Sequence, residues 1–271
     1  MAFSESASAV ITSRSNARIK QLRAAFAGQA RLSGGLVAIE GDNLLNEALR
    51  SGMVLKTIFI SERRELPRSV PKSVEVLWLA NDIFASVVET QSPQGIAALL
   101  VPPVHKLDAV LEKTPLIVVA AGLQDPGNLG TLIRSAEAFG ATGILSTPGT
   151  VSAWNQKALR ASAGSVFRTP VVAATLEDLS SLKSQGIQIA AAVAEDAYKV
   201  IPAHKADLSQ PTAILIGNEG SGLSDELLAL ADIFVTIPCP GRVESLNAAI
   251  AASLLLYEAA QQRAASSKTK A

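Results

Sequence analysis

The chain has 271 residues, 48% of them hydrophobic, and 24 Lys+Arg balance 24 Asp+Glu, so its formal net charge is zero. This composition favours a globular protein of one or two domains, and the neutral balance gives no global sign of nucleic-acid binding. Its apolar runs are shorter than the roughly 20 residues of a membrane span, and its first residues lack a secretory signal, so a cytoplasmic protein without membrane contact is expected.

The first hundred residues alternate between helix-like and strand-like segments. Residues 14–32 carry apolar side chains at helical spacing with basic residues between them, which predicts an amphipathic helix. Further patterns predict strands at 36–39, 55–60, 74–79 and 96–101 and helices at 42–50 and 82–88. A small α/β domain of residues 1–105 is therefore expected, ending where Pro102 and Pro103 interrupt regular structure.

Apolar strands also alternate with helices in residues 106–271. The predicted strands are 116–121, 143–145, 186–193, 212–216 and 233–237, and the predicted helices are 129–139, 154–163, 224–230 and 245–263. A disordered tail is expected at 264–271. Apolar strands between helices are typical of a parallel sheet covered on both faces, whose ligands bind beyond the carboxyl ends of the strands.

The two halves differ in charge. Residues 1–106 contain 12 Lys+Arg and 9 Asp+Glu, residues 107–271 contain 12 and 15, and no acid occurs between Ser6 and Ile39. The basic residues of this acid-free stretch are Arg14, Arg18, Lys20, Arg23 and Arg31. Because phosphates attract Lys and Arg, the stretch is a candidate RNA-binding patch, although an ordinary solvated helix face would have the same pattern.

Metal chemistry is not expected. The chain has one cysteine, Cys239, and two histidines, His105 and His204, which is too few for a zinc site and leaves no internal disulfide.

Three segments after predicted strands of the second half combine glycines with polar residues. Residues 124–140 place glycines at a helix entry and Arg134 about one and a half turns inside the helix. Residues 213–224 lead into a loop with three glycines around Glu219, and residues 237–248 pass through Pro238 to a helix start near Ser245. Each alone has an ordinary explanation, since helix N-termini bind anions in general and Ser245 suits an N-cap.

In their order and spacing the three segments resemble the signature motifs of the SpoU (TrmH-like) RNA methyltransferases of the SPOUT superfamily. They match N-x-G-x-x-x-R at 128–134, G-N-E-G at 217–220, and I-P at 237–238 leading to S-L-N at 245–247. The resemblance covers residues 115–263. The first domain is similar in layout to a ribosomal-protein-like RNA-binding domain, and residues 92–96 resemble its Q-G-I segment.

The resemblance implies a C-terminal domain, residues 106–271, that forms a trefoil knot, a feature that fold physics alone would not propose. It implies methyl transfer from S-adenosylmethionine to a ribose 2′-hydroxyl of RNA without a metal. Ribosomal RNA is the expected substrate, and transfer RNA is the alternative. It also implies a homodimer, and an alanine-rich face is the expected contact: Ala248, Ala249, Ala251, Ala252 and Leu255.

The resemblance also assigns residues to the site. Expected catalytic residues are Arg134, Asn128, Glu219, Ser245 and Asn247. Expected cofactor-binding residues are Leu215, Ile216, Gly217, Asn218, Gly220, Ile237, Pro238, Leu246, Asn247 and Ala248. Arg134 serves either as a base or as an electrostatic stabiliser of the developing alkoxide, and both roles stay open. Cys239-Pro240 departs from the family's usual apolar residue and is expected to reshape the cofactor pocket slightly.

Two other classes of protein compete with this interpretation. A nucleotide-dependent oxidoreductase would also have glycine-rich loops after strands, but no complete G-x-G-x-x-G follows the first strand of either half. A non-catalytic RNA-binding protein of the same fold predicts erosion of Arg134, the Asn-Glu-Gly loop or the Ser-Leu-Asn element, and all three are intact.

Overall fold

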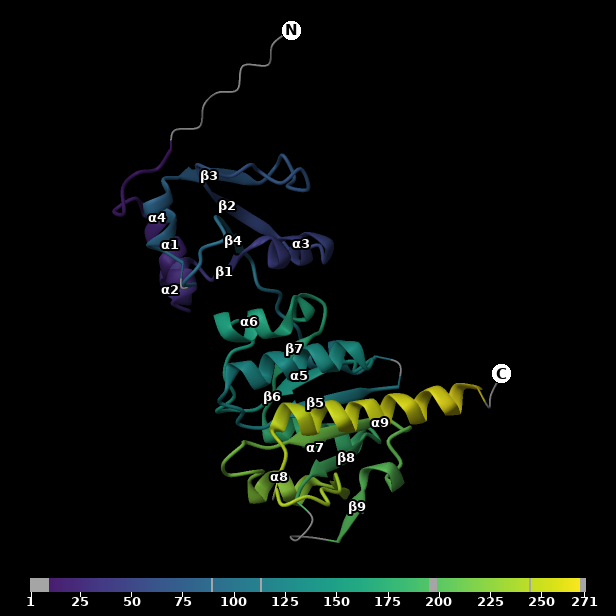
Figure 1. The fold of residues 1–271 in the computed structure, drawn as a ribbon. Coiled ribbons are helices and arrows are strands. Elements are labelled where there is room, and N and C mark those ends of the chain that lie inside the picture. The colour runs from purple at the N-terminus through teal and green to yellow at the C-terminus, as the bar shows by residue number, and fades with distance from the viewer. Residues whose placement is uncertain (1–9, 89, 113, 195–198, 244, 269–271) are drawn as a thin grey trace. The chain divides into compact units, whose positions relative to one another are not determined.

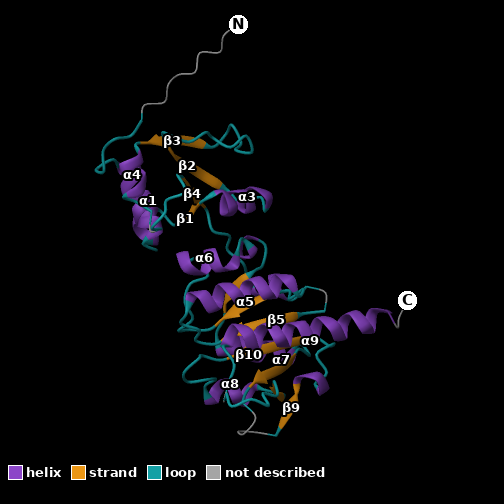
Figure 2. Ribbon diagram, viewed as in Figure 1, coloured by secondary structure: helices purple, strands orange, loops and turns teal. Residues whose placement is uncertain are grey.

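The computed structural model describes residues 10–88, 90–112, 114–194, 199–243 and 245–268. The chain divides into two compact units, Met1–Pro103 and Val104–Ala271, each of which is an α/β structure (Figures 1 and 2). No helix in the described part of the chain is both long enough and apolar enough to cross a membrane.

The first unit is a four-stranded mixed sheet with helices packed against it. Its elements are α1 (Ala17–Phe26), α2 (Ala30–Ser33), β1 (Val37–Glu40), α3 (Asp42–Arg50), β2 (Leu55–Ser61), β3 (Glu75–Leu79), α4 (Asn81–Ala85) and β4 (Ile96–Leu100). The strand order is β1-β4-β2-β3, with β4 antiparallel to both of its neighbours. Ile19, Leu22 and Phe26 of α1 pack with Phe59 and Phe84 in one buried cluster.

The single helix predicted over residues 14–32 is wrong in extent. The chain forms two helices, because Gly28 takes a φ of 68° that a continuing right-handed helix does not allow. Asn16 begins α1 by accepting a hydrogen bond from the Arg18 amide at 2.8 Å.

The second unit is a seven-stranded, all-parallel sheet in the order β7-β6-β5-β10-β8-β11-β9. Its strands are β5 (Leu116–Ala120), β6 (Gly143–Ser146), β7 (Val171–Ala173), β8 (Gln188–Ala192), β9 (Val200–Pro202), β10 (Thr212–Ile216) and β11 (Ile233–Thr236). Its helices are α5 (Pro126–Ala138), α6 (Gln156–Ser162), α7 (Leu176–Ser184), α8 (Asp225–Leu230) and α9 (Ala248–Lys268), with short 3₁₀ turns at Leu107–Val110, Ser165–Phe167 and Ala203–Lys205.

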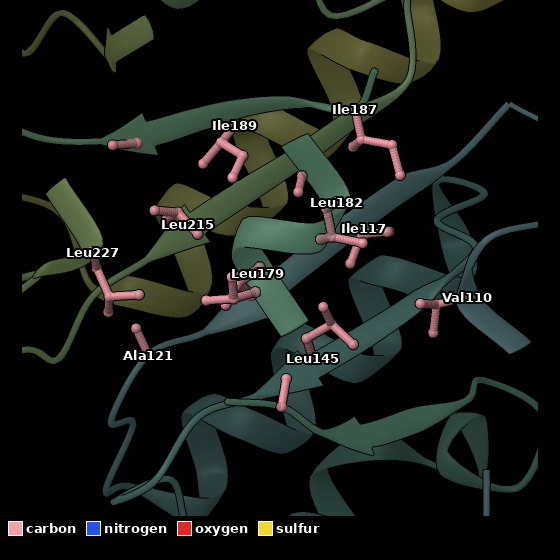
Figure 3. Packing of buried hydrophobic residues seen from close by; sticks show 14 of the residues in the cluster. Val110, Ile117, Ala121, Leu145, Leu179, Leu182, Ile187, Ile189, Leu215 and Leu227 are labelled. Atoms are coloured by element: carbon pink, nitrogen blue, oxygen red, sulfur yellow. The ribbon is translucent and has the colours of Figure 1, made fainter. Parts of the chain in front are cut away.

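Both faces of this sheet are covered, which confirms the parallel α/β prediction. Leu179 and Leu182 of α7 and Leu227 of α8 pack on Ile117 and Leu215 of the sheet (Figure 3). Successive side chains of a strand point to opposite faces of the sheet, so the strands also present apolar side chains on the second face. Helices α5 and α9 cover that face. These two helices lie side by side and parallel, joined by a 2.7 Å hydrogen bond between the Ser135 and Ser253 hydroxyls and an edge contact between Phe139 and Tyr257.

The structure adds three elements that the sequence patterns did not predict: β7, α7 and β9. It also changes both ends of the last helix, which begins at Ala248 instead of 245 and continues to Lys268. The tail expected from 264 is therefore helical over 264–268, while 269–271 lie outside the described residues.

Candidate active site

The three glycine-containing segments follow β5, β10 and β11, which all run in the same direction in one sheet. Their carboxyl ends therefore meet at one edge, the edge at which open α/β sheets bind ligands. Residues about 90 to 120 positions apart in the chain are thereby brought into hydrogen-bonding contact.

A chain of side-chain hydrogen bonds joins all three segments. The Asn247 amide Nδ2 donates to Asn128 Oδ1 at 3.0 Å, and Asn128 Nδ2 donates to Glu219 Oε1. Asn247 Oδ1 accepts from the amides of Ala249 and Ile250 at 3.0 and 3.3 Å, so Asn247 caps α9. The sequence suggests this N-cap role for Ser245, but the structure gives it to Asn247. The cap fixes the orientation of the Asn247 side-chain amide that donates to Asn128.

The loop after β10 is closed by Asn218. Its backbone exchanges hydrogen bonds with Gly222 at 3.0 and 2.9 Å, and its Nδ2 donates to the Gly122 carbonyl at 2.8 Å, which ties the loop to the β5–α5 connection. A Cβ added to Gly217 would lie 2.5 Å from the backbone carbon of Gly222. Position 217 therefore accepts only glycine without moving the loop.

A cavity of about 870 Å³ lies beside this loop. Of the predicted cofactor-binding residues, the lining contains Ile216, Gly217, Asn218, Ile237, Leu246 and Ala248, and of the predicted catalytic residues it contains Glu219 and Ser245. Its described lining does not include Leu215, Gly220, Pro238 or Asn247. Leu215 is fully buried in the sheet core. Cys239 also lines the cavity, and its thiol donates to the Ile237 carbonyl at 3.3 Å.

Sequence reasoning missed part of this lining. Val193 just beyond β8, Leu228 of α8 and Val235 of β11 contribute apolar walls, and Arg242 contributes a charge. Two of these positions had a usable signal, because Val193 follows a parallel strand at the same sheet edge and Arg242 lies within the segment 237–248 that follows another.

Arg134 lies apart from the hydrogen-bonded chain. It follows Asn128 by six residues on α5, which places it about 9 Å further along the axis and about 120° around it. Its side chain is exposed, and within the described residues it has no hydrogen bond or ion pair. The structure thus brings together Asn128, Glu219 and Asn247, but not Arg134.

The entry of α5 is held by neighbouring groups. Asp125 Oδ1 accepts from the Asn128 amide at 2.9 Å, and Lys157 Nζ lies 2.6 Å from Asp125 Oδ2. The Lys157 hydrogen bond and then the Asn128 amide lower the pKa of the Asp125 carboxyl. A Cβ on Gly130 would lie 2.4 Å from the Ala158 carbonyl oxygen, so α5 and α6 pack backbone to backbone. Asn128 therefore projects from a fixed helix start.

The five basic residues predicted to contact RNA are all exposed on the first unit. Three of them, Arg18, Lys20 and Arg23, line a groove of about 850 Å³ along α1 and α2. Arg18 also forms a 2.8 Å ion pair with Glu75, whereas the side chains of Lys20 and Arg23 have no hydrogen bond or ion pair within the described residues.

Neither the cavity of the second unit nor the groove along α1 and α2 contains a described group of metal ligands. Within the described residues, no three His, Cys, Asp or Glu side chains form a group that would hold a metal ion.

Comparisons with known proteins identify the family and the fold. Residues 115–257 match the SpoU rRNA Methylase family, and residues 16–98 match the MRM3-like substrate binding domain. The chain is 35% identical over 250 residues to the 23S rRNA (guanosine(2553)-2′-O)-methyltransferase RlmP of Bacillus subtilis, covering 91% of this chain and 97% of that protein.

Two solved structures are similar across both units. The SpoU methyltransferase AviRb from Streptomyces viridochromogenes, in complex with AdoMet, has a TM-score of 0.81 and 30% identity over 92% of this chain and 98% of that chain. An AdoMet-bound rRNA methyltransferase from Sinorhizobium meliloti has a TM-score of 0.83 and 29% identity over 93% and 97%. With its three motifs assembled at one sheet edge, the chain belongs to the SpoU methylase family.

Proposed function

We propose that this protein transfers the methyl group of S-adenosylmethionine to a ribose 2′-hydroxyl of ribosomal RNA. The observation that carries the proposal is the hydrogen-bonded chain Asn247–Asn128–Glu219 beside the 870 Å³ cavity. The names of the relatives support ribosomal RNA as the substrate, and a relative named as a tRNA/rRNA methyltransferase keeps transfer RNA as the alternative.

The cavity suits the cofactor. Its lining combines apolar side chains such as Ile216 and Leu246 with the backbone of the half-buried Gly217, groups that suit an adenosyl moiety and a short aliphatic chain. When bound, S-adenosylmethionine supplies a methyl group on a positively charged sulfur. The protein's own task is to align the ribose oxygen with that methyl group and to stabilise the oxygen as its proton leaves.

We assign the two halves of that task to different residues. The Asn128–Glu219 pair, fixed through Asn247, holds the ribose side by hydrogen bonds. Arg134 stabilises the negative charge that develops on the 2′-oxygen, because an arginine side chain is a strong electrostatic partner and a poor proton acceptor. Ser245 shapes the cavity floor.

We also propose a homodimer, but with a different contact from the alanine-rich face. Ala248, Ala249, Ala252 and Leu255 are buried within their own subunit. The exposed apolar residues of α9 are instead Ile250, Leu254 and Tyr257, at 52%, 43% and 49% exposure, spaced one turn apart on one side of the helix. Because this stripe borders α5, a partner subunit packed on it lies beside the exposed Arg134. Arg134 of one subunit then completes the site of the other.

The dimer has a direct test. Changing Ile250 and Leu254 together to glutamate is expected to give a monomer, because each charge would be buried in the contact. Light scattering at micromolar concentration should return 28.1 kDa for this variant and twice that mass for the wild type. Leu176→Glu on α7 is the control, since Leu176 is equally exposed at 43% on the other sheet face. A monomeric wild type contradicts the proposal.

The first unit is proposed to select the RNA through the groove of α1 and α2. Replacing Lys20 and Arg23 with alanine should reduce the slope of log affinity against log salt by about 1.4–1.8, because each lost phosphate contact accounts for about 0.7–0.9. The matched control removes two exposed charges elsewhere in the same unit, Arg50 and Lys56. Equal slopes for both variants would assign RNA binding to another surface.

The substrate is tested by mapping 2′-O-methylated positions in ribosomal and transfer RNA from cells with and without this protein. One ribosomal position should lose its methyl group. Loss from transfer RNA alone selects the alternative substrate, and an unchanged map favours a non-catalytic RNA-binding protein.

We further propose that the second unit is knotted at this site and that the protein works in the cytoplasm. The family resemblance supports the knot, together with the lining of one cavity by both the β10–α8 and the β11–α9 loops. The expected ribosomal substrate supports the location.

A further inference from the structure

The wall of the cavity carries one positive charge, Arg242, that has no part in the proposed roles of Asn128, Glu219 and Arg134. Among its described lining residues only Glu219, Cys239 and Arg242 are titratable. Arg242 lies in the loop between β11 and α9, and its neighbours Gly241 and Val243 line the cavity as well. The side chain of Arg242 is exposed, and Val243 is 60% exposed, so residues 241–243 form a solvent edge of the cavity.

Within the described residues, no partner occupies the Arg242 side chain, which leaves it available for an external anion. No described residue gives it a hydrogen bond or ion pair, whereas Arg18, Arg168 and Arg263 are each engaged within the protein. A guanidinium presents a planar fork of donors that matches the oxygens of a phosphate or carboxylate. A single such group at a cavity edge therefore favours a ligand whose anion stays near solvent.

Two anions meet this description, the carboxylate of the cofactor and a phosphodiester of the RNA. The cavity's 870 Å³ lies near the upper end of the roughly 300–1,000 Å³ typical of small-molecule sites, which leaves room for part of a nucleotide beside the cofactor. Glu219, which we place on the ribose side, lines the same cavity as Arg242. A ribose 2′-hydroxyl and its 3′-phosphate are carried by adjacent carbons, so groups that hold both belong to one site.

We propose that Arg242 binds the phosphodiester next to the target ribose and so positions the 2′-hydroxyl at the cavity. This inference rests on the proposed function. Arg242 is a positioning residue, because it holds the phosphate and not the reacting oxygen. Its loss should therefore raise KM for RNA more than it lowers kcat, and should leave cofactor affinity unchanged.

The test compares Arg242→Ala, Arg242→Lys and the control Arg50→Ala in the full-length protein. The probes are S-adenosylmethionine, measured by calorimetry, and transcribed large-subunit ribosomal RNA, measured at several salt concentrations. Arg242→Ala should bind the cofactor within twofold of wild type, bind RNA about tenfold more weakly, and reduce the salt slope by about 0.7–0.9. Arg242→Lys should keep the slope and regain part of the affinity, since it retains the charge without the fork. Arg50→Ala should match wild type.

Two results overturn the inference. A tenfold loss of cofactor affinity with an unchanged salt slope assigns Arg242 to the cofactor carboxylate, and unchanged values for both ligands leave it an ordinary surface arginine. A wild-type protein that binds RNA but methylates none contradicts the proposed function instead. In that case the salt slopes still report whether Arg242 contacts a phosphate.

Discussion

Arg134→Ala is expected to abolish methyl transfer while S-adenosylmethionine binding stays nearly intact. Arg134 lies on α5, outside the described lining of the cavity, so its removal leaves the cofactor's contacts in place. Its side chain is also exposed and has no hydrogen bond or ion pair within the described residues, so folding should be unaffected. Removing one group that stabilises a developing oxyanion typically costs a hundredfold or more in kcat.

The measurement pairs calorimetry with a tritium-transfer assay. Thr131→Ala is the control, because Thr131 lies on the same exposed side of α5 one turn earlier. If Arg134→Ala keeps more than about a tenth of wild-type kcat, a loss below roughly 1.4 kcal/mol, Arg134 is not the catalytic residue.

Mixed dimers reveal whether each site takes Arg134 from the partner. A heterodimer of Arg134→Ala and Glu219→Gln subunits contains one fully intact site only if Glu219 of one subunit works with Arg134 of the other. Activity in the mixture, with neither homodimer active, supports the shared site. An inactive mixture places both residues in the same subunit's site.

The sequence was sufficient for the features that depend on local pattern. Apolar runs located β5, β10 and β11, and parallel direction then placed the loops after them at one sheet edge. Gly217 and Asn218 were assigned to ligand binding, and both line the cavity. The positions of these strands and of the loops after them are confirmed, because strand periodicity and glycine-rich loops are encoded by neighbouring residues, whereas ligand binding by Gly217 and Asn218 stays a prediction.

Features set by tertiary packing were not predictable in the same way. The separation of Arg134 from Asn128 follows from helical phase, and the Asn247 cap depends on where α9 meets α5. The missed helix α7 has few apolar residues, although its Thr175–Asp178 capping box was a usable local signal. Residues 264–268 are polar and alanine-rich, which concealed the last turns of α9.

The end of α9 supplies a second large expected effect, on stability. The Arg263 guanidinium donates to four backbone carbonyls, those of Leu208 at 3.1 Å, Thr114 at 2.8 Å, Pro115 at 3.0 Å and Gln210 at 2.6 Å. It therefore ties α9 to the chain just before β5 and just before β10. Burial lowers the pKa of the Arg263 side chain from its ordinary value, as expected for a charge held by carbonyls in place of water.

Arg263→Met should reduce the free energy of unfolding by about 3 kcal/mol, because hydrogen bonds to a charged group contribute about 1.5–3 kcal/mol each and some of the carbonyls would regain water. For a chain of this size, that corresponds to a fall in Tm of roughly 6–12 °C. Arg263→Lys keeps the charge but not the planar fork, so its Tm should lie between those of the wild type and Arg263→Met. Arg50→Met is the control, since the Arg50 side chain is 76% exposed. A change for Arg263→Met no larger than that of the control would mean that these contacts do not hold α9 to the sheet.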